Sequence, residues 1–568
     1  MTKALPLVLL AAVLLAAPAL ADAPAAGTTT SAPPASPAPP ADPKAAAEWD
    51  ACRAKNGATY EQQIAGCTAR IESGQEDTVH LANAYYDRAL TEQQMGDYDK
   101  ALADQNKAIS INPKDPDFFS TRGISYYSLK KFDLALADLD ESIRLKADEA
   151  DEYTMRGTIY AAMGRSDDAM TDYNQALRLK PGDPVALIDR AIAHHDRGEY
   201  AAAIVDYTEV IRVQPDSFPA YSGRGTSYAR SLQYDKAIAD FTVAIRLKPD
   251  DATGYGGRGT AYAITGKIDL AIADFDEALK RKPDDTIILT NRAIAHNQKG
   301  QYDAALADYA AVLRIAPDNV EALLGRGAAE GDLGQLDSAL ADFNAAIRLK
   351  PDFGPAYADR CHLYLNQRKT DAAMADCEHA VQLKPDDFVA LTLRGNVFLR
   401  TAKYDRALAD FNAALKLKPD YPEAFGGLAG VAEAFGRFGV AVGEFDRYIA
   451  LQPDADGYND RCWARAQWGE QLDQALDDCN KALSLRANDA SALESRSLVQ
   501  LRLRHYDAAL ADATAALHRD PRRPAALYIR GIAKYRLGDN TSGNSDIAAA
   551  ASIDTDIASQ FANFGVTP

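Results

Sequence analysis

The chain is poor in cysteine and tryptophan, and its one strongly apolar stretch lies at the N-terminus. Only 6 cysteines and 3 tryptophans occur among 568 residues. No segment after residue 21 is apolar enough to cross a bilayer, so we expect no integral membrane span once the N-terminal segment is removed. The sequence also lacks a phosphate-binding loop, a cluster of metal ligands, and a nucleophile grouped with an acid and a base. We therefore expect no enzyme activity, no cofactor and no metal.

Basic residues are outnumbered by acidic ones. Lys and Arg total 62 and Asp and Glu total 81, which gives a net charge of −19. A surface of this charge repels the phosphates of nucleic acids and the head groups of anionic lipids. We therefore expect no nucleic-acid partner and no binding to an anionic membrane surface.

The N-terminus has the pattern of an export signal. Residues 1–21 contain one early charge, Lys3, then an apolar run from Ala4 to Ala17, and small residues at Ala19 and Ala21. This pattern predicts a signal peptide that is cut after Ala21, and hence secretion to the periplasm. The alternative is a retained membrane anchor, but the run is shorter than the roughly 20 apolar residues that a span requires. Residues 22–47 are rich in Ala and Pro and are predicted to be a linker.

The rest of the chain repeats itself at a constant interval. Proline marks the interval at Pro113, Pro181, Pro215, Pro249, Pro283, Pro317, Pro351, Pro385, Pro419, Pro453 and Pro521. Within residues 218–250, apolar and small residues recur at helical spacing in two successive stretches, and Pro249 ends the second one. Each repeat is therefore predicted to be a pair of amphipathic helices, which must stack on its neighbours to bury its apolar faces.

This helix-turn-helix unit, with its small, aromatic and proline positions, resembles the tetratricopeptide repeat. The resemblance implies an all-α fold, a right-handed superhelical solenoid of about fifteen repeats. We assign residues 48–75 to a degenerate first repeat and residues 80–555 to the tandem array. Residues 556–568 are predicted to form a C-terminal capping helix and tail, because the end of a solenoid needs a cover for its exposed apolar face.

The cysteines occupy two positions of the repeat that should face each other. Cys361 lies at the position of Gly225, and Cys377 at the position of Phe241. The other four cysteines fit the same two positions if one turn is a residue longer and another is shorter. Zinc binding would need four converging ligands, and a redox motif would need the Cys-x-x-Cys spacing, which is absent. Because cysteine pairs in exported proteins are oxidised, we predict the disulfides Cys52–Cys67, Cys361–Cys377 and Cys462–Cys479.

An arginine and an aspartate recur at a fixed spacing in most repeats. Examples are Arg224 with Asp240, Arg258 with Asp274, and Arg292 with Asp308. We predict that each pair forms a partly buried ion pair between the two helices of its repeat, because Cys361 and Cys377 have the same spacing. Leu428 and Glu444 break the pattern in a repeat that is rich in glycine. That repeat is either a soft joint or a place of closer packing.

The family resemblance also implies a concave groove, lined by the first helices of successive repeats, that binds segments of partner proteins. The positions carried over to this groove are Ile124, Thr158, Ile188, Ile192, Thr226, Thr260, Ile294 and Leu324. They are neutral, which predicts a groove for apolar or neutral peptide. Since lysine is missing from them, we exclude the family members that bind acidic C-termini of chaperones. The alternative is that these side chains only pack neighbouring helices.

These observations predict a non-enzymatic periplasmic scaffold or adaptor that binds an unidentified protein or peptide in its groove. One alternative is a structural subunit of a cell-envelope assembly, such as polysaccharide export or cell-wall machinery. A second alternative is a small-molecule carrier or an unrecognised enzyme. The sequence shows no convergent polar cluster, which disfavours the second alternative.

Overall fold

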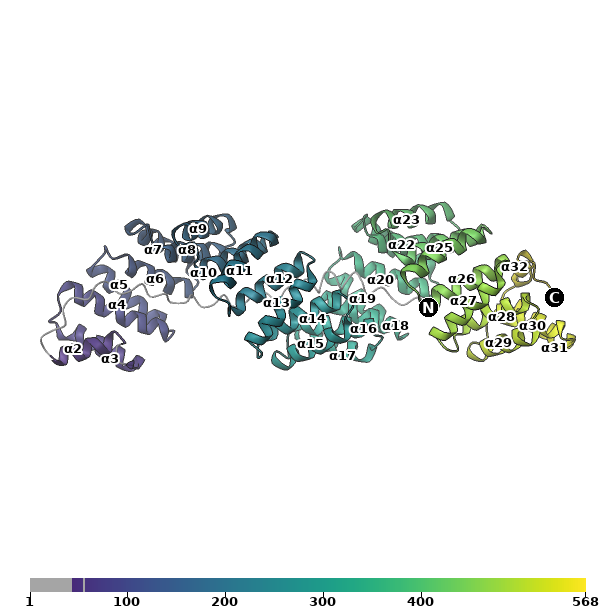
Figure 1. Ribbon diagram of the computed structural model, residues 1–568, viewed down its shortest axis with the longest axis horizontal. Coiled ribbons are helices and arrows are strands. Elements are labelled where there is room, and N and C mark those ends of the chain that lie inside the picture. Colours follow the sequence, from purple (N-terminus) through teal and green to yellow (C-terminus); the bar gives the residue numbers. More distant parts are fainter. Residues whose placement is uncertain (1–42, 55–56) are drawn as a thin grey trace. The chain divides into compact units, whose positions relative to one another are not determined.

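The computed structural model describes residues 43–54 and 57–568, which form α-helices and no β-strand (Figure 1). The predicted signal peptide and residues 22–42 of the predicted linker lie outside the described residues. Among the described residues, the first helix is α2, which begins at Pro43, so residues 43–47 are helical and do not belong to the linker as predicted. Pro43 is tolerated there because the first helical position needs no N–H donor.

The helices divide into two compact bodies, of which one ends at Lys299 and the other begins at Gly300. The helices of the N-terminal body are α2 Pro43–Cys52, α3 Tyr60–Ser73, α4 Thr78–Gln94, α5 Tyr98–Ile111, α6 Pro116–Ser128, α7 Phe132–Leu145, α8 Ala150–Ala162, α9 Ser166–Leu179, α10 Pro184–Asp196, α11 Tyr200–Val213, α12 Phe218–Arg230, α13 Tyr234–Leu247, α14 Ala252–Ile264, α15 Ile268–Arg281 and α16 Thr286–Gln298. The helices of the C-terminal body are α17 Tyr302–Ile315, α18 Val320–Asp332, α19 Leu336–Leu349, α20 Gly354–Asn366, α21 Thr370–Leu383, α22 Phe388–Arg400, α23 Tyr404–Leu417, α24 Pro422–Ala434, α25 Phe438–Leu451, α26 Ala455–Trp468, α27 Leu472–Leu485, α28 Ala490–Arg502, α29 Tyr506–Arg519, α30 Pro524–Arg536, α31 Asn540–Ile553 and α32 Ile557–Asn563.

Within each body, successive helices stack in the order of the sequence. The two helices of a repeat pack on each other, as α12 does on α13, and the second helix then packs on the first helix of the next repeat, as α13 does on α14. The predicted all-α solenoid of helix pairs is confirmed. At the C-terminus, α32 buries Ile557 and Phe561 against the last repeat, where the Phe561 ring lies 4.9 Å from that of Tyr528.

Turn and cap residues explain where the helices begin and end. Asp183 caps α10 by accepting a hydrogen bond from the backbone N–H of Ala186, and Pro184 follows at the first helical position. Between the two helices of each repeat, one residue takes a left-handed conformation. Glycine meets this requirement without strain, as Gly198 does at φ 76°, although Leu232 occupies the same position at φ 61°.

Most of the recurrent arginines form a fork with an aspartate, and several of them, such as Arg224, join three helices. Arg224 of α12 donates from Nε and Nη2 to both carboxylate oxygens of Asp240 in α13, at 2.7 and 2.8 Å. Its remaining nitrogen, Nη1, donates to Thr208 Oγ1 of the preceding second helix at 3.0 Å. Arg258 repeats the arrangement with Asp274 and Thr242. The fixed spacing of arginine and aspartate indicates the first contact, and the reach to the preceding repeat was not predicted.

The predicted pair of Arg292 and Asp308 spans the two bodies and stays a prediction. Arg292 Nη1 donates to Asp276 of the preceding second helix at 2.6 Å, as the other forks do. Asp308 is buried in the C-terminal body.

The glycine-rich repeat of α24 and α25 lacks the fork. Leu428 replaces the arginine, and Glu444 replaces the aspartate and pairs with Arg447 of its own helix at 3.2 Å. Here the structure favours close packing over a soft joint. A Cβ atom at Gly427 would lie 2.3 Å from the ring of Phe411, so any other residue would displace that ring.

This contact leads to a prediction for two glycines in adjacent helices. Gly427→Ala lowers the free energy of unfolding by about 1–3 kcal/mol, because the added methyl group overpacks the Phe411 ring. Gly443 of α25 is exposed, and a Cβ there meets nothing within 4 Å. Gly443→Ala therefore raises the free energy of unfolding by about 0.5–1 kcal/mol through helix propensity. Urea unfolding followed by circular dichroism measures both changes, and stabilisation by both substitutions would instead identify a soft joint.

Candidate functional site

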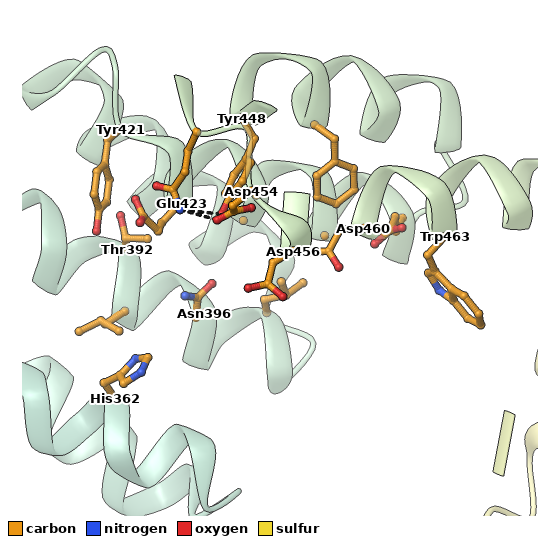
Figure 2. Close-up of a pocket in the computed structure, with 18 of the residues that line it drawn as sticks. His362, Thr392, Asn396, Tyr421, Glu423, Tyr448, Asp454, Asp456, Asp460 and Trp463 are labelled. Atoms are coloured by element: carbon orange, nitrogen blue, oxygen red, sulfur yellow. Dashed lines mark hydrogen bonds between the residues drawn. The ribbon is translucent and has the colours of Figure 1, made fainter. Parts of the chain in front are cut away.

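The C-terminal body contains a pocket of about 440 Å³ on the first helices of three successive repeats. Its walls come from the first helices α22, α24 and α26 and from the second helix α25, with His362 of α20 at one side (Figure 2). The first helices are the elements that the sequence analysis assigns to the groove. This pocket therefore lies on the predicted binding face and is a candidate site.

Two local features open the pocket. The lining residues Gly426, Gly427 and Gly430 place the backbone of α24, without side chains, against the cavity. In addition, α24 and α26 barely touch each other, whereas α22 packs on α24 and α26 packs on α28. The space that a side chain and a close helix contact would occupy elsewhere is thus left free.

The pocket carries several carboxylates and little compensating positive charge. Glu423, Glu433, Asp454 and Asp460 line it, and none of the four forms an ion pair within 4.0 Å with a cation of the described residues. Arg486 is the single arginine or lysine in the lining, and it is held by Asp456 at 2.7 and 3.0 Å. The site is therefore negatively charged when its carboxylates are ionised.

The pKa values of these carboxyl groups are also shifted. Desolvation by the surrounding protein raises the pKa of Glu433 to about 8. Asp460 is exposed to the pocket, but protein encloses it from most directions, and this raises its pKa to about 7. The pKa of Glu423 is raised for the same reason. Burial lowers the pKa of His362 to about 4, so this imidazole is neutral near pH 7 and supplies no positive charge.

Two polar groups of the pocket have no hydrogen-bond partner among the described residues. Tyr421 is only 4% exposed, and its hydroxyl points toward Thr392 across the cavity without a hydrogen bond to any described residue (Figure 2). Glu423 Oε2 is likewise buried and without a hydrogen bond in the described part of the chain. Buried polar atoms usually have partners, so Glu423 Oε2 indicates a site that can receive one, and the Tyr421 hydroxyl lies beside it in the same pocket.

The aromatic side chains of the pocket are held in place by polar contacts. The Tyr448 hydroxyl lies 3.3 Å from Asp454 Oδ2, and the amide of Gln452 donates to the same oxygen at 2.6 Å. Trp463 donates from its indole nitrogen to the side-chain oxygen of Gln467 at 3.2 Å when that amide directs its nitrogen to Glu433. The rings therefore border the carboxylates in defined orientations.

The residues predicted to line the groove are placed differently from one another. Ile188, Ile294 and Leu324 are buried, with 7%, 3% and 0% of their surface exposed, and contact with a partner stays a prediction for them. Their side chains fill the interface between neighbouring helices. Thr158, Thr260, Ile124, Ile192 and Thr226 are half-buried.

Hydrogen bonds between first helices account for two of these threonines. Thr158 donates to Asp189 of the next first helix at 2.8 Å, and Thr260 accepts from Asn291 of the next first helix at 3.3 Å. Packing between helices, which the sequence left open as an alternative, therefore describes these two residues. The partner of Thr158 is a carboxylate, which a neutral groove does not contain.

The first helices also carry carboxylates beside the neutral positions that are predicted to line the groove. An aspartate directly precedes the fork arginine in four repeats, as Asp87, Asp189, Asp359 and Asp460. Desolvation raises the pKa of every one of them, to about 6 for Asp189 and to about 7 for the other three. The recurrence of the Asp-Arg pair is the sequence signal that could have identified them, because adjacent helix residues point in different directions.

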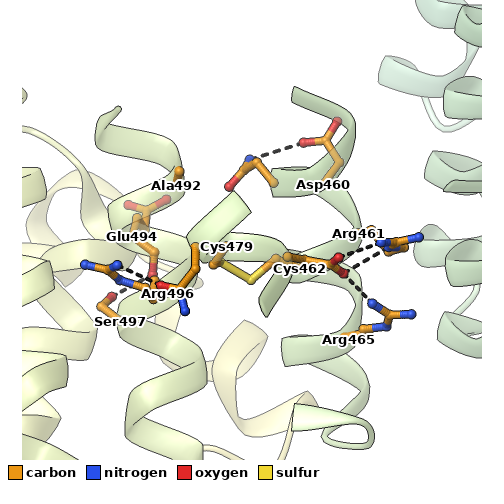
Figure 3. Close-up of a disulfide and its surroundings, with 12 residues drawn as sticks. Asp460, Arg461, Cys462, Arg465, Cys479, Ala492, Glu494, Arg496 and Ser497 are labelled. Atoms are coloured by element: carbon orange, nitrogen blue, oxygen red, sulfur yellow. Dashed lines mark hydrogen bonds and ion pairs between the residues drawn. A yellow bond between two sulfur atoms is a disulfide. The ribbon is translucent and has the colours of Figure 1, made fainter. Parts of the chain in front are cut away.

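The six cysteines form the three disulfides that the repeat positions predict. Cys52–Cys67, Cys361–Cys377 and Cys462–Cys479 have Cα–Cα distances of 4.6, 5.6 and 5.5 Å. Figure 3 shows the disulfide between Cys462 and Cys479. The extra residue between Cys462 and Cys479 is accommodated in α26, which has 14 residues where α24 has 13, and the turn is not lengthened as predicted. The third disulfide thus anchors α26, the helix that carries Asp460 into the pocket.

Comparison with known proteins agrees with the repeat. Three family models described as tetratricopeptide repeat match the chain. One of them matches residues 154–219, 222–286, 290–352, 392–456 and 495–551, which is more than half of the chain. The other two match residues 82–115 and 355–387. Among curated proteins, none matches the chain significantly.

Solved structures with a similar arrangement include the anaphase-promoting complex hetero-tetramer Cut9–Hcn1, at 17% identity and a TM-score of 0.48, over 84% of this chain and 93% of that chain. Another is a tetratricopeptide repeat protein from Parabacteroides merdae, at 24% identity and a TM-score of 0.40, over 43% of this chain and 97% of that chain. Among the described helices, none has the length and apolar composition to cross a membrane.

The raised pKa of Glu433 predicts a pH dependence of stability. Between its ordinary value of 4.5 and about 8, Glu433 binds more protons in the folded state than in the unfolded state. The free energy of unfolding therefore falls as the pH rises through this range. Glu433→Gln makes this fall smaller, and Asp477→Asn, at an exposed position of α27, leaves it unchanged. Urea unfolding measured between these pH values tests the effect, and equal slopes for wild type and Glu433→Gln would contradict it.

The disulfide within the repeat of α20 and α21 is predicted to raise the free energy of unfolding. A second pair of substitutions at the same positions is predicted to restore part of this free energy when the disulfide is removed. Replacing Cys361 and Cys377 together with alanine lowers the free energy of unfolding by about 3 kcal/mol, because the unfolded chain gains entropy. The double variant Cys361→Gly and Cys377→Phe copies the pair of Gly225 and Phe241, and it recovers part of the loss by packing. Urea unfolding without reductant measures all three proteins. Equal stability of the wild type and the alanine variant would show that the disulfide does not constrain the chain.

Proposed function

Because the chain belongs to the tetratricopeptide repeat family, we propose that it is an exported scaffold that binds a segment of a partner protein on its first helices. Proteins of this family generally act as non-catalytic interaction scaffolds. The observation that carries the proposal is the pocket on α22, α24 and α26, which has polar groups without hydrogen-bond partners and lies on the face that the family uses.

Export to the periplasm is supported by two independent features. Residues 1–21 have the charge, apolar run and small residues of a signal peptide. All six cysteines are paired in disulfides, and disulfides persist in oxidising compartments. A scaffold in the periplasm would find its partners among envelope proteins.

A site-specific crosslinker distinguishes the proposed binding face from the rest of the surface. A photoreactive benzophenone amino acid is placed at Ile192 or Trp463, half-buried on the first helices α10 and α26. Matched positions are the exposed apolar residues Val205 and Leu270 on the second helices α11 and α15. After irradiation of cells, we expect the same protein adduct from the first-helix positions and none from the second-helix positions.

The adduct also decides between two kinds of scaffold. A stable complex of fixed stoichiometry that copurifies with the adduct would identify a structural subunit of an envelope assembly. Adducts from the second helices alone, or from neither set of positions, would contradict the proposed binding face.

A further inference from the structure

The chain itself shows how its first helices bind a cation. Glu494 of α28 accepts two hydrogen bonds from the guanidinium group of Arg523, both at 2.9 Å. Arg523 lies in the connection that leads into α30, the first helix of the following repeat. This two-pronged contact is the strongest arrangement between an arginine and a carboxylate.

The preceding repeat lacks this arginine and has a carboxylate next to the position of Glu494. Glu494 is the fifth residue of α28, and the fifth residue of α26 is Asn459, which Asp460 follows. Asp489 stands before α28 where Arg523 stands before α30. Asp489 cannot supply a cation, and its side chain instead caps α28 by accepting from the backbone N–H groups of Ser491 and Ala492. Asp460 therefore faces the pocket with only a hydrogen bond from Asn459, at 3.3 Å.

The rest of the pocket also favours a cation over other ligands. Glu423, Glu433 and Asp454 add negative charge, and Arg486 is already held by Asp456. The faces of aromatic rings attract cations, and Tyr448 and Trp463 border the carboxylates. A metal ion is disfavoured, because no group of His, Cys, Asp and Glu in the described residues is arranged to hold one. A volume of about 440 Å³ lies within the range of roughly 300–1,000 Å³ for ligand pockets.

We propose that this pocket binds the guanidinium group of an arginine side chain in the partner segment, with Asp460 as the principal carboxylate and the Tyr421 hydroxyl as a further contact. The proposal rests on the proposed function, since it names the chemistry of the segment that the scaffold holds. The incoming arginine forms with Asp460 the kind of contact that Arg523 forms with Glu494 in the following repeat. Glu423, whose Oε2 has no hydrogen-bond partner in the described residues, offers a second acceptor.

The test uses the full chain and three probes in isothermal titration calorimetry. The first is an acetylated and amidated pentapeptide, Gly-Ala-Arg-Ala-Gly. The second replaces its arginine with citrulline, which has nearly the same shape and no charge. The third is agmatine, which carries the guanidinium group without a peptide. We expect the arginine peptide to bind at least about tenfold more tightly than the citrulline peptide, as charged hydrogen bonds require.

Variants locate the binding in the pocket. Asp460→Asn weakens binding of the arginine peptide by about tenfold, and Tyr421→Phe weakens it by a smaller factor. Asp477→Asn removes the same charge from the exposed side of α27 and leaves binding unchanged. Both pocket substitutions nearly preserve side-chain volume, and circular dichroism checks that the helices remain folded. If Asp460→Asn loses helix, the affinity of Tyr421→Phe for the arginine peptide and the comparison of the arginine and citrulline peptides decide whether the pocket binds arginine.

The outcomes separate this proposal from the proposed function. Equal affinity for the arginine and citrulline peptides, or unchanged affinity in both Asp460→Asn and Tyr421→Phe, overturns the arginine pocket. Agmatine binding as tightly as the peptide overturns the partner side chain as the source and identifies a free amine ligand. If the crosslinked adduct still forms in those cases, the scaffold function stands. If the arginine peptide binds as expected and no adduct forms, the pocket stands and the scaffold function is wrong.

Discussion

The arginine fork is the interaction on which the stacking of the repeats depends. A single guanidinium group joins the two helices of its own repeat through an aspartate, and it also reaches the second helix of the preceding repeat. Because the aspartate is buried, as Asp240 is at 6% exposure, removal of one partner would leave an uncompensated charge inside the protein. Electrostatics thus sets the register of helices that apolar packing alone would leave less well defined.

A repeat that lacks the fork contributes to the pocket. Without an arginine at Leu428, the fork does not join α24 to α25, and the Phe411 ring of α23 packs closely on Gly427. The glycines of α24 leave backbone exposed to the cavity beside α26. The loss of the arginine fork and the candidate pocket therefore occur in the same repeat. Functional sites often lie where a fold is strained or less regular.

Some of the acidic residues that give the chain its negative charge line the pocket, where they affect which ligand can bind. Carboxylates gather on the first helices at positions where protein surrounds them, and desolvation, together with the charge of neighbouring carboxylates, raises the pKa values of Glu433 and Asp460. Binding of a cation would favour their ionised forms and would recover the energy of desolvation. Overall charge therefore bears on which partners the scaffold accepts, and not only on which partners it repels.

The helix pairs, the spacing of Arg224 and Asp240, and the pairing of the cysteines could all be predicted from the amino-acid sequence. Each of these follows from distances within one repeat, which the constant interval reproduces along the chain. Which first-helix residues are exposed could not be read in this way, and Ile188 and Leu324 are buried against expectation. The pocket could be found only in the folded chain. The pocket depends on the separation of α24 from α26, and on Asp489 occupying the position that Arg523 has in the following repeat. Both features arise between neighbouring repeats, so the pattern of one repeat does not reveal them.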